Sequence, residues 1–322
     1  MDQISIVIPT HRRIEALRRT IDSLAKQELD GLEAELIVVC SGSVVGHSER
    51  VSEAVAGHPL PARVLSRPEG GSAGARNAGV EAAASDLILF LNDDTPPAST
   101  DLVVGHARAH DEDTDPWRGV LGPVVWDPHL AITPVMDWMS RTGKMNDYAG
   151  LEAEGEGTPT LYAPGLSIHR SALVAVGGFD ERFSRYGWAE YDLALRLFDR
   201  GFRIAFRPDL VVWHDHRYTL GDSLRRMESV GRAANLLNRV HAARDELATP
   251  RPAGAKGRAA RLLAPAATYV PVPGWMPGRL RDQTYRTLHY AMLARGYAQP
   301  EIPAGNGMRG GIGDGKAPAP QR

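Results

Sequence analysis

Two adjacent carboxylates, Asp93 and Asp94, come directly after a continuous apolar run at residues 87–91. A run of this length is typical of a buried strand, so the acids are expected at its end. Carboxylate oxygens are the ligands that Mg²⁺ and Mn²⁺ prefer, and adjacent acids repel each other unless a cation is present. The pair therefore predicts a divalent-metal site, with an exposed turn before Pro96 and Pro97 as an equal alternative.

A second pair of acids, Glu190 and Asp192, begins a helix that the sequence predicts over residues 189–200. At 3.6 residues per turn, Glu190 falls on the apolar stripe of this helix, whereas Asp192 shares a face with Arg196. Burying an acid is costly unless it faces a cleft or a partner, so Glu190 is the better candidate general base. Asp192 is the second catalytic candidate and a partner for Arg196. For Glu190 the alternative role is stabilisation of the helix N-terminus.

Two segments could hold an anion. Residues 9–13, Pro-Thr-His-Arg-Arg, follow the first predicted strand, where Thr10 can cap a helix and the arginine pair can face the anion. A solvated helix start is the alternative. Residues 70–79 form a Gly-rich entry to a helix, which can bring backbone N–H groups close to phosphates, and Arg76 adds a forked donor. Helix packing through small residues is the competing interpretation.

Two histidines, His214 and His216, come at the end of another predicted strand. Because they are two residues apart, they point to the same side if the strand continues. Imidazoles in this place can bind a metal or a phosphate, and ordinary surface histidines are the alternative.

Short β-branched runs alternate with helical runs through the first hundred residues, which is typical of a parallel sheet with crossover helices. Ligands bind beyond the carboxyl ends of such strands, where all the segments above lie. Residues 99–159 are predicted to be loops and irregular strands. The predicted strands are 4–8, 34–39, 62–66, 87–91, 162–169, 203–206 and 210–213, and the predicted helices are 12–26, 48–56, 73–84, 171–176 and 189–200.

The composition indicates a soluble globular protein of 322 residues, with 43% hydrophobic and 24% charged residues. A net charge of -2 argues against a dedicated nucleic-acid binder. A single cysteine, Cys40, suits a reducing cytosol, and neither a secretory signal nor a membrane-spanning run is expected. We therefore predict a cytoplasmic protein.

The C-terminal region is locally basic, with ten Lys or Arg and three Asp or Glu between Arg239 and Gly296. A basic, mainly helical region is expected over residues 217–302, and a disordered tail over 303–322 because Gly, Pro and polar residues dominate there. The basic residues form either a solvated helical face or a patch that touches an anionic surface such as a membrane.

Taken in order, these motifs resemble glycosyltransferase family 2 over about residues 3–216. The resemblance implies a GT-A fold, which is α/β with a mostly parallel central sheet. It also implies a nucleotide-sugar donor, a divalent metal (Mn²⁺ or Mg²⁺) and inversion at the anomeric carbon. The catalytic domain is expected over residues 1–216, with a donor half at 1–97 and an acceptor half at 98–216.

The resemblance also implies roles for single residues. Asn92 occupies the first position of the metal-binding Asp-x-Asp motif, so Asp94 is the expected metal ligand, together with His214. Glu190 is the expected base, although Ala189 replaces the acid that precedes it in the family. The expected donor-binding residues are Pro9, Thr10, Arg12, Arg13, Ser41, Gly71, Arg76, Asn77, Asn92 and Asp93.

The largest departure from the family follows the second strand, where Cys40 and Ser41 replace acids that recognise the nucleotide base. Ser41 can substitute through its hydroxyl group. Uridine is the family default, and thymidine and guanosine donors are alternatives. The acceptor pocket is expected at Gly165, Trp188 and Glu190 with the segment 126–148, whereas Trp117, Trp126 and Trp138 are expected to pack in the core or in loops.

The leading hypothesis is thus an inverting glycosyltransferase that uses a small-molecule, peptide or lipid-linked acceptor. The competing hypothesis is a non-catalytic nucleotide-sugar binder or scaffold protein, because expected acids are missing at Cys40, Ser41 and Asn92. A related nucleotidyl or sugar-phosphate enzyme is disfavoured by the block from Gly177 to Leu197.

Overall fold

A computed structural model of the chain describes residues 1–148, 151, 161–184, 186–242, 252, 254–273 and 275–299. The tail expected to be disordered, 303–322, lies outside these residues.

The described residues form a central sheet of seven strands in the order β3-β2-β1-β4-β7-β5-β8. Neighbours pair in parallel except β7, which runs antiparallel to both β4 and β5. The mostly parallel α/β sheet of the sequence prediction is therefore confirmed. Its strands are β1 (Gln3–Thr10), β2 (Glu33–Ser41), β3 (Ala62–Arg67), β4 (Leu87–Phe90), β5 (Arg118–Leu121), β7 (Leu166–His169) and β8 (Arg203–Phe206).

Helices cover both faces of the sheet because successive strand residues alternate between the two faces. In β1, Ile6 and Ile8 pack into one core cluster, whereas Val7 packs into the other. The first cluster also holds Cys40 and lies under α1 (Ile14–Leu24), α2 (His47–Val55) and α4 (Leu102–Asp111). The second lies under α3 (Gly71–Ala82), α7 (Arg170–Ala175) and α8 (Ala189–Phe198).

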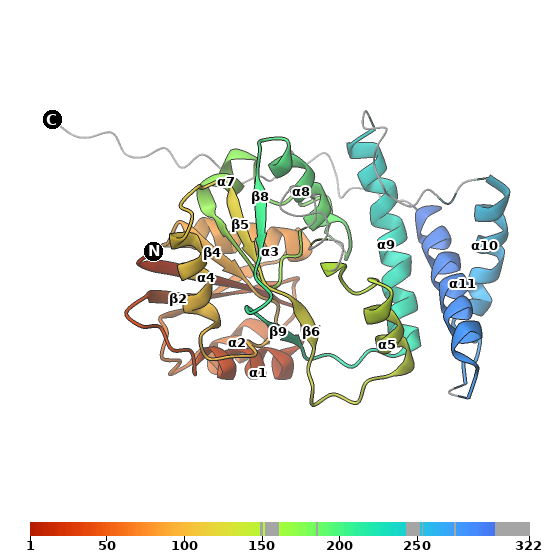
Figure 1. Cartoon of the computed structure of the whole chain (residues 1–322), viewed down its shortest axis with the longest axis horizontal. Helices are drawn as coiled ribbons and strands as arrows, with labels where there is room; N and C mark the ends of the chain where they lie inside the picture. Colours follow the sequence, from red (N-terminus) through yellow and green to blue (C-terminus); the bar gives the residue numbers. More distant parts are fainter. Residues whose placement is uncertain are drawn as a thin grey trace.

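A smaller parallel pair, β6 (Val124–Trp126) and β9 (Val212–His214), lies beside the main sheet. Beyond it stand four helices: α5 (Pro134–Arg141), α9 (Leu220–Val240), α10 (Gly254–Ala267) and α11 (Gly278–Tyr297). Figure 1 shows α9, α11 and α10 side by side at the edge of the molecule farthest from β1 and β2. The expected helical C-terminal region is therefore present.

The expectation of loops and irregular strands over 99–159 is wrong where α4 and α5 lie, whereas the short strands β5 and β6 agree with it; residues 149, 150 and 152–160 lie outside the described residues. Most side chains of α4 are buried, and they include the polar His106 and His110, so polar residues do not mark one face and the helical period is hidden in the sequence. Thr133 caps α5 ahead of Pro134 at its first turn. In the same way, the strand expected over 162–169 is confined to β7.

Trp138 joins α5 to the C-terminal helices. Its side chain is 1% exposed and packs against Tyr285 and His289 of α11, with ring centroids 5.4 and 4.7 Å away. The core role expected for Trp138 is confirmed. No described helix is long and apolar enough to cross a membrane.

Candidate functional site

The adjacent carboxylates lie buried at the carboxyl ends of β1 and β4. Asp93 is 1% exposed and Asp94 is 2% exposed, so the alternative of an exposed turn is wrong. The hydroxyl of Thr10 at the end of β1 donates to Asp93 Oδ2 at 3.0 Å, and the Thr20 hydroxyl in α1 donates to the Asp93 carbonyl at 3.0 Å. Strand β1 and helix α1 thus hold the two acids in place.

A single guanidinium, that of Arg13, lies against both acids. Its Nη2 is 2.5 Å from Asp93 Oδ1, and its Nη1 is 2.5 Å from Asp94 Oδ2. Burial and the neighbouring Asp94 raise the pKa of Asp93 to about 6 in spite of Arg13. Against the effect of burial, contacts with His214 and Arg13 lower the pKa of Asp94. Asp94 is therefore the more persistent anion of the pair.

His214, at the end of β9, completes this group. Its Nε2 lies 3.4 Å from Asp94 Oδ2, and its ring stacks on Trp126 with centroids 5.0 Å apart. His216 follows, with its ring centroid 6.2 Å from that of His214. Trp126 was expected to pack in the core or in a loop, yet here it supports the histidine nearest to the acids. We call Arg13, Asp93, Asp94 and His214 the carboxylate cluster.

The residues of the carboxylate cluster fit a divalent cation that shares its coordination with a phosphate ligand. Asp94 Oδ1 and His214 Nδ1 are buried without a hydrogen-bond partner. No group of three or more acids, histidines or cysteines among the described residues could hold a metal alone. Mg²⁺ in phosphate-transfer sites is typically held by one or two carboxylates plus phosphate oxygens, so a complete protein cage is not required.

Arg76 connects this end of the sheet to the candidate base. The Arg76 side chain is 4% exposed; its Nη2 donates to Asn92 Oδ1 at 3.1 Å, and its Nη1 lies 3.2 Å from Glu190 Oε1. Burial lowers the pKa of Arg76, while Glu190 opposes this shift. Glu190 keeps 28% of its side chain exposed, so it is ion-paired and accessible at the same time.

Asp192 lies in a different environment from Glu190. It is fully buried, with Oδ2 accepting from Arg196 Nη2 at 2.6 Å and Oδ1 lying 2.8 Å from Nε2 of His241 at the end of α9. The expected pairing with Arg196 is confirmed. A catalytic role for Asp192 stays a prediction, and these contacts favour a role in fixing α8 against α9.

The Gly-rich entry to α3 is tightly packed. A Cβ on Gly71, which has φ +57°, would lie 1.9 Å from the Ser184 carbonyl oxygen, and one on Gly79 would lie 2.3 Å from Val7 Cγ1. Asn77 exchanges hydrogen bonds with the backbone of Phe179 at 2.9 Å in both directions. These contacts support the competing interpretation, packing through small residues, and donor binding by Gly71 and Asn77 stays a prediction.

The remaining expected donor residues line the ends of β1 and β2. Pro9 is buried within β1, opposite Val39. The Ser41 hydroxyl donates to the Thr10 carbonyl at 3.2 Å, and Arg12, with φ 64°, donates its backbone N–H to His47 Nε2 at 3.2 Å. The structure thus brings these residues to one edge of the sheet, next to the carboxylate cluster.

Two expected acceptor residues flank this edge. Gly165 donates its backbone N–H to the Phe90 carbonyl at 2.9 Å, just before Asn92. Trp188 has φ 63° at the start of α8 and donates its indole N–H to the Val230 carbonyl of α9 at 3.0 Å. Contact of either residue with an acceptor stays a prediction.

Sequence reasoning missed Arg226 of α9. Its guanidinium lies 4.2 Å from the Tyr186 ring centroid, and its Nη1 donates to the Tyr218 hydroxyl at 2.9 Å. Burial lowers its pKa to about 10, and the negative charge of Asp94 opposes this shift. Arg226 lies within α9, beyond His214 and His216, the last residues that the sequence motifs single out, so no spacing signal pointed to it.

A second group of buried polar side chains lies under α4, and we call it the histidine cluster: His106, His110, Ser167 and His169. The Ser167 hydroxyl lies 2.8 Å from His106 Nδ1 and 3.0 Å from His110 Nε2. The His110 and His169 rings meet edge to face at 5.1 Å. Burial lowers the pKa of His106 to about 3 and that of His110 to about 4, so these rings are neutral.

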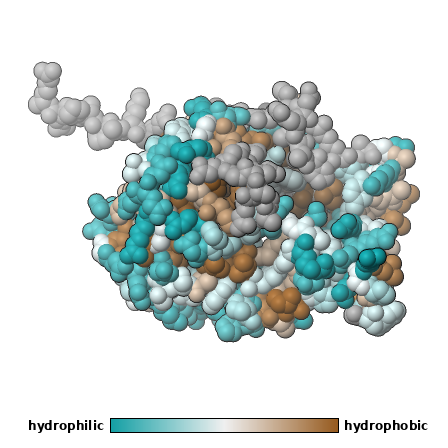
Figure 2. Space-filling view, in the orientation of Figure 1, coloured by the Kyte–Doolittle hydropathy of each residue, from teal (hydrophilic) through white to brown (hydrophobic). Residues whose placement is uncertain are grey.

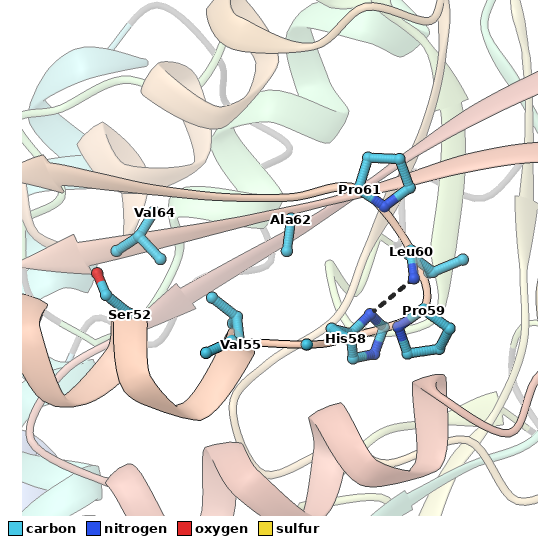
Figure 3. A pocket seen from close by; sticks show the side chains of 10 residues that line it. Ser52, Val55, His58, Pro59, Leu60, Pro61, Ala62 and Val64 are labelled. Carbon is cyan, nitrogen blue, oxygen red and sulfur yellow. Dashed lines mark hydrogen bonds between the residues drawn. The ribbon is translucent and has the colours of Figure 1, made fainter.

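An open hollow between α2 and β3 is a poor candidate for the site. It lies toward the amino ends of β2 and β3, and Figure 3 shows Pro59, Pro61 and His58 around it. His58 Nδ1 accepts the Leu60 N–H at 3.1 Å, the bond drawn in Figure 3, and its Nε2 lies 3.2 Å from the Ile21 carbonyl. Both imidazole nitrogens are therefore already used.

The sequence is similar to those of known glycosyltransferases. The sequence model described as "Glycosyl transferase family 2" matches residues 5–121. A pre-mycofactocin glycosyltransferase of Mycobacterium tuberculosis is 30% identical over 237 residues, which cover 72% of this chain and 46% of that protein. The uncharacterized glycosyltransferase YfnE of Bacillus subtilis is 26% identical and is covered over 64% of its length. The chain thus spans about half the length of the mycobacterial relative.

Solved structures show the same fold. The mannosyltransferase PcManGT from Pyrobaculum calidifontis, solved with GDP-Man and Mn²⁺, aligns with a TM-score of 0.58 at 18% identity, covering 91% of this chain and 86% of that one. Residues 1–349 of S. aureus TarS, solved with UDP, align with a TM-score of 0.51 at 16% identity over 92% and 89% of the two chains. The fold is of the GT-A type. Over residues 5–121, the chain matches glycosyltransferase family 2.

Proposed function

We propose that the chain is a metal-assisted, inverting glycosyltransferase that uses a nucleoside-diphosphate sugar as donor and Glu190 as general base. One observation carries this proposal. The buried guanidinium of Arg76 contacts both Asn92 and Glu190. It therefore links the candidate base to the strand end that bears Asp93 and Asp94.

The carboxylate cluster is the proposed site of the donor diphosphate. Asp94 and His214 would hold a divalent cation, which supplies neutralisation of the charge that develops on the leaving diphosphate. Arg13 already contacts both acids, so it would have to share Asp94 with the cation or release it. Arg76 and Arg226 add positive charge near the proposed diphosphate site.

Glu190 is proposed to act on the acceptor. Its carboxylate accepts the proton of an acceptor hydroxyl as that oxygen bonds to the anomeric carbon and the bond from this carbon to the diphosphate breaks. A single displacement of this kind inverts the configuration. Arg76 Nη1 lies 3.2 Å from Glu190 Oε1 and holds the carboxylate in position, and the exposed part of the side chain gives the acceptor access.

The identity of the nucleotide is a finer proposal. A UDP-sugar is the first donor to test because uridine is the family default, and TarS was solved with UDP. GDP- and dTDP-sugars are the alternatives, since PcManGT was solved with GDP-Man and Ser41 stands where the family has acids. The proposed acceptor is a small molecule, a peptide or a lipid-linked sugar acceptor that reaches Glu190 at the exposed part of its side chain.

Donor hydrolysis and ligand binding test the proposal together. A thermal-shift series with UDP, GDP and dTDP, each with and without Mn²⁺ or Mg²⁺, should single out one nucleotide whose effect needs metal and is lost in Asp94→Asn. The corresponding sugar nucleotide should then be cleaved, and Glu190→Gln should lower the rate about 10²- to 10⁴-fold while leaving nucleotide binding intact.

Glu81→Gln, an exposed acid at the far end of α3, is the matched control and should keep full activity. A metal-dependent nucleotide shift without cleavage of any donor would favour the competing hypothesis, a non-catalytic binder. Full activity of Glu190→Gln would contradict the role of the base.

A further inference from the structure

Helix α10 exposes large apolar side chains to solvent, beside the exposed Lys256 and Arg258. Leu262 is 82% exposed and Leu263 is 55% exposed. The opposite face, which carries Ala260 and Ala264, is buried against the neighbouring helix. In Figure 2, hydrophobic atoms appear along the outer edge where Figure 1 places α10. A helix that is only solvated would carry polar residues on this outer face.

The connection between α10 and α11 continues this apolar surface. Tyr269 is 85% exposed and Trp275 is 83% exposed, and Leu280 in the first turn of α11 is 52% exposed. Six of the ten large hydrophobic side chains that are exposed among the described residues lie within residues 262–280. We call α10, α11 and their connection the C-terminal hairpin. Such clustering marks an interaction surface rather than scattered surface residues.

Positive charge surrounds these apolar side chains. Residues 254–297 contain seven Lys or Arg and a single acid, Asp282, which is ion-paired with Arg141 of α5 at 3.2 Å. Lys256, Arg258 and Arg279 are exposed. Leu, Trp and Tyr flanked by Lys and Arg are typical of helices that lie in the interface of an anionic bilayer.

We propose that the C-terminal hairpin docks on an anionic lipid surface, with Leu262, Leu263 and Trp275 entering the headgroup region and the basic side chains contacting lipid phosphates. This binding is independent of the proposed transfer reaction. It requires no membrane-spanning helix, in agreement with the helices described.

Other occupants fit this surface less well. A second copy of the chain would place the same basic residues against one another, and like charges oppose such contact. The remaining C-terminal sequence, residues 300–322, offers only Ile302, Met308 and Ile312 as large apolar side chains, and it carries further basic residues. An anionic surface satisfies both the apolar and the charged groups.

The C-terminal hairpin is firmly joined to the rest of the protein, so docking would also orient the candidate site. In addition to the Trp138 contacts, α9 and α11 approach closely: a Cβ on Gly231 would lie 2.1 Å from the Leu293 carbonyl oxygen, and one on Gly296 would lie 1.9 Å from that of Glu228. Helices in such contact move together. A membrane bound at the C-terminal hairpin would therefore stand at a set angle to Glu190.

Vesicle co-sedimentation of the full chain tests the proposal. We expect binding to vesicles of phosphatidylcholine mixed with phosphatidylglycerol, weaker binding to phosphatidylcholine alone, and a marked loss near 1 M salt, where the Debye length falls to about 3 Å. The double variant Leu262→Gln/Trp275→Gln should bind at least about tenfold more weakly. Arg258→Gln/Arg279→Gln should lose most of the preference for the anionic lipid.

Matched controls lie on the opposite side of the chain. Val45→Gln and Arg18→Gln alter an exposed apolar and an exposed basic residue outside the C-terminal hairpin, and both should bind as the unaltered protein does. Equal binding of all variants, or no binding to anionic vesicles at low salt, would overturn the proposal. So would self-association in analytical ultracentrifugation that the Leu262→Gln/Trp275→Gln variant abolishes, because it would identify a second copy as the occupant.

Discussion

The carboxylate cluster and the histidine cluster are both buried polar groups in one sheet, but they differ in charge and in position. The first combines Arg13 with two acids at the carboxyl ends of the strands. The second lies under α4, where Ser167 pairs with Leu89 in the middle of β4, and its His106 and His110 rings are neutral. Both contain buried nitrogen or oxygen atoms without partners.

A buried polar group therefore marks a functional site only when other features agree. The carboxylate cluster has opposite charges that must be balanced, an accessible neighbour in Glu190, and a place where open α/β sheets bind ligands. The histidine cluster lies away from this edge of the sheet, its His106 and His110 rings are neutral, and its contact with an acid is that of His169 with Asp86 at 2.8 Å. We therefore expect changes in the first cluster to affect ligand binding, and changes in the second to affect stability alone.

Replacement of Arg13, the cationic side chain of the carboxylate cluster, should have the largest effect on stability. Arg13→Met removes the guanidinium that contacts both Asp93 and Asp94, so we expect a loss of about 2–3 kcal/mol in the free energy of unfolding. Mn²⁺ should restore stability, because saturation to 100 times the dissociation constant contributes about 2.7 kcal/mol. Arg18→Met, on the exposed side of α1, is the control. Equal stability of the two variants in urea unfolding would remove the basis for the comparison.

Acid should destabilise the protein partly through the histidine cluster. The pKa values of His106 and His110 are about 3 and about 4 in the folded state, below the ordinary value of 6.5. As the pH falls below 6.5, the unfolded chain binds protons that the folded chain does not, so each histidine lowers stability by up to about 1.4 kcal/mol per pH unit. The folded pKa sets the lower end of this range.

His106→Gln removes one of these titrations and should flatten the pH dependence of urea unfolding between about pH 6.5 and pH 4. His129→Gln, an exposed histidine, should leave it unchanged. An unaltered slope in His106→Gln would show that this ring is charged or exposed in the folded protein.

Loss of the Ser167 hydroxyl, which contacts both His106 and His110, should have a smaller effect on stability. Ser167→Ala leaves one nitrogen of each facing ring without its hydrogen bond, and we expect a loss of about 1–3 kcal/mol in stability. Nucleotide affinity should stay as in the unaltered protein. A change in calorimetric nucleotide affinity at constant fold would contradict the separation of the two clusters.

The smallest effect is expected from Asn92→Asp, which restores the acid of the family motif. Arg76 can donate to a carboxylate as it does to the amide, so the fold should be retained. A further carboxylate near Asp94 should strengthen Mn²⁺ binding severalfold, measured by calorimetry in the presence of nucleotide. Weaker Mn²⁺ binding would indicate that the amide at this position serves the site better than an acid does.

The regular half of the fold could be predicted from the sequence. Strands β1 to β4 and helices α1 to α3 lie within a few residues of the predicted ranges, because their apolar runs and helical stripes alternate clearly. Helix α4 could not be predicted, because His106 and His110 occupy buried positions at which apolar residues would have shown the helical period.

The candidate site, too, could be predicted only in part. Helical projection placed Glu190 on the apolar stripe and Asp192 beside Arg196, yet Asp192 is the buried acid and Glu190 keeps an exposed edge. Projection of one helix cannot reveal a second helix that covers its polar face, and here α9 supplies His241 as a partner for Asp192. Arg226 comes from that same helix, which explains why it also escaped prediction.

The single cysteine makes the protein convenient for site-specific labelling. Cys40 is 1% exposed within β2, and burial raises the pKa of its thiol, so a maleimide reacts poorly with it. A cysteine introduced at an exposed position would therefore take up a fluorophore alone, without removal of the native residue. A dye at position 275 would report lipid contact, and one at position 45 would supply the reference signal.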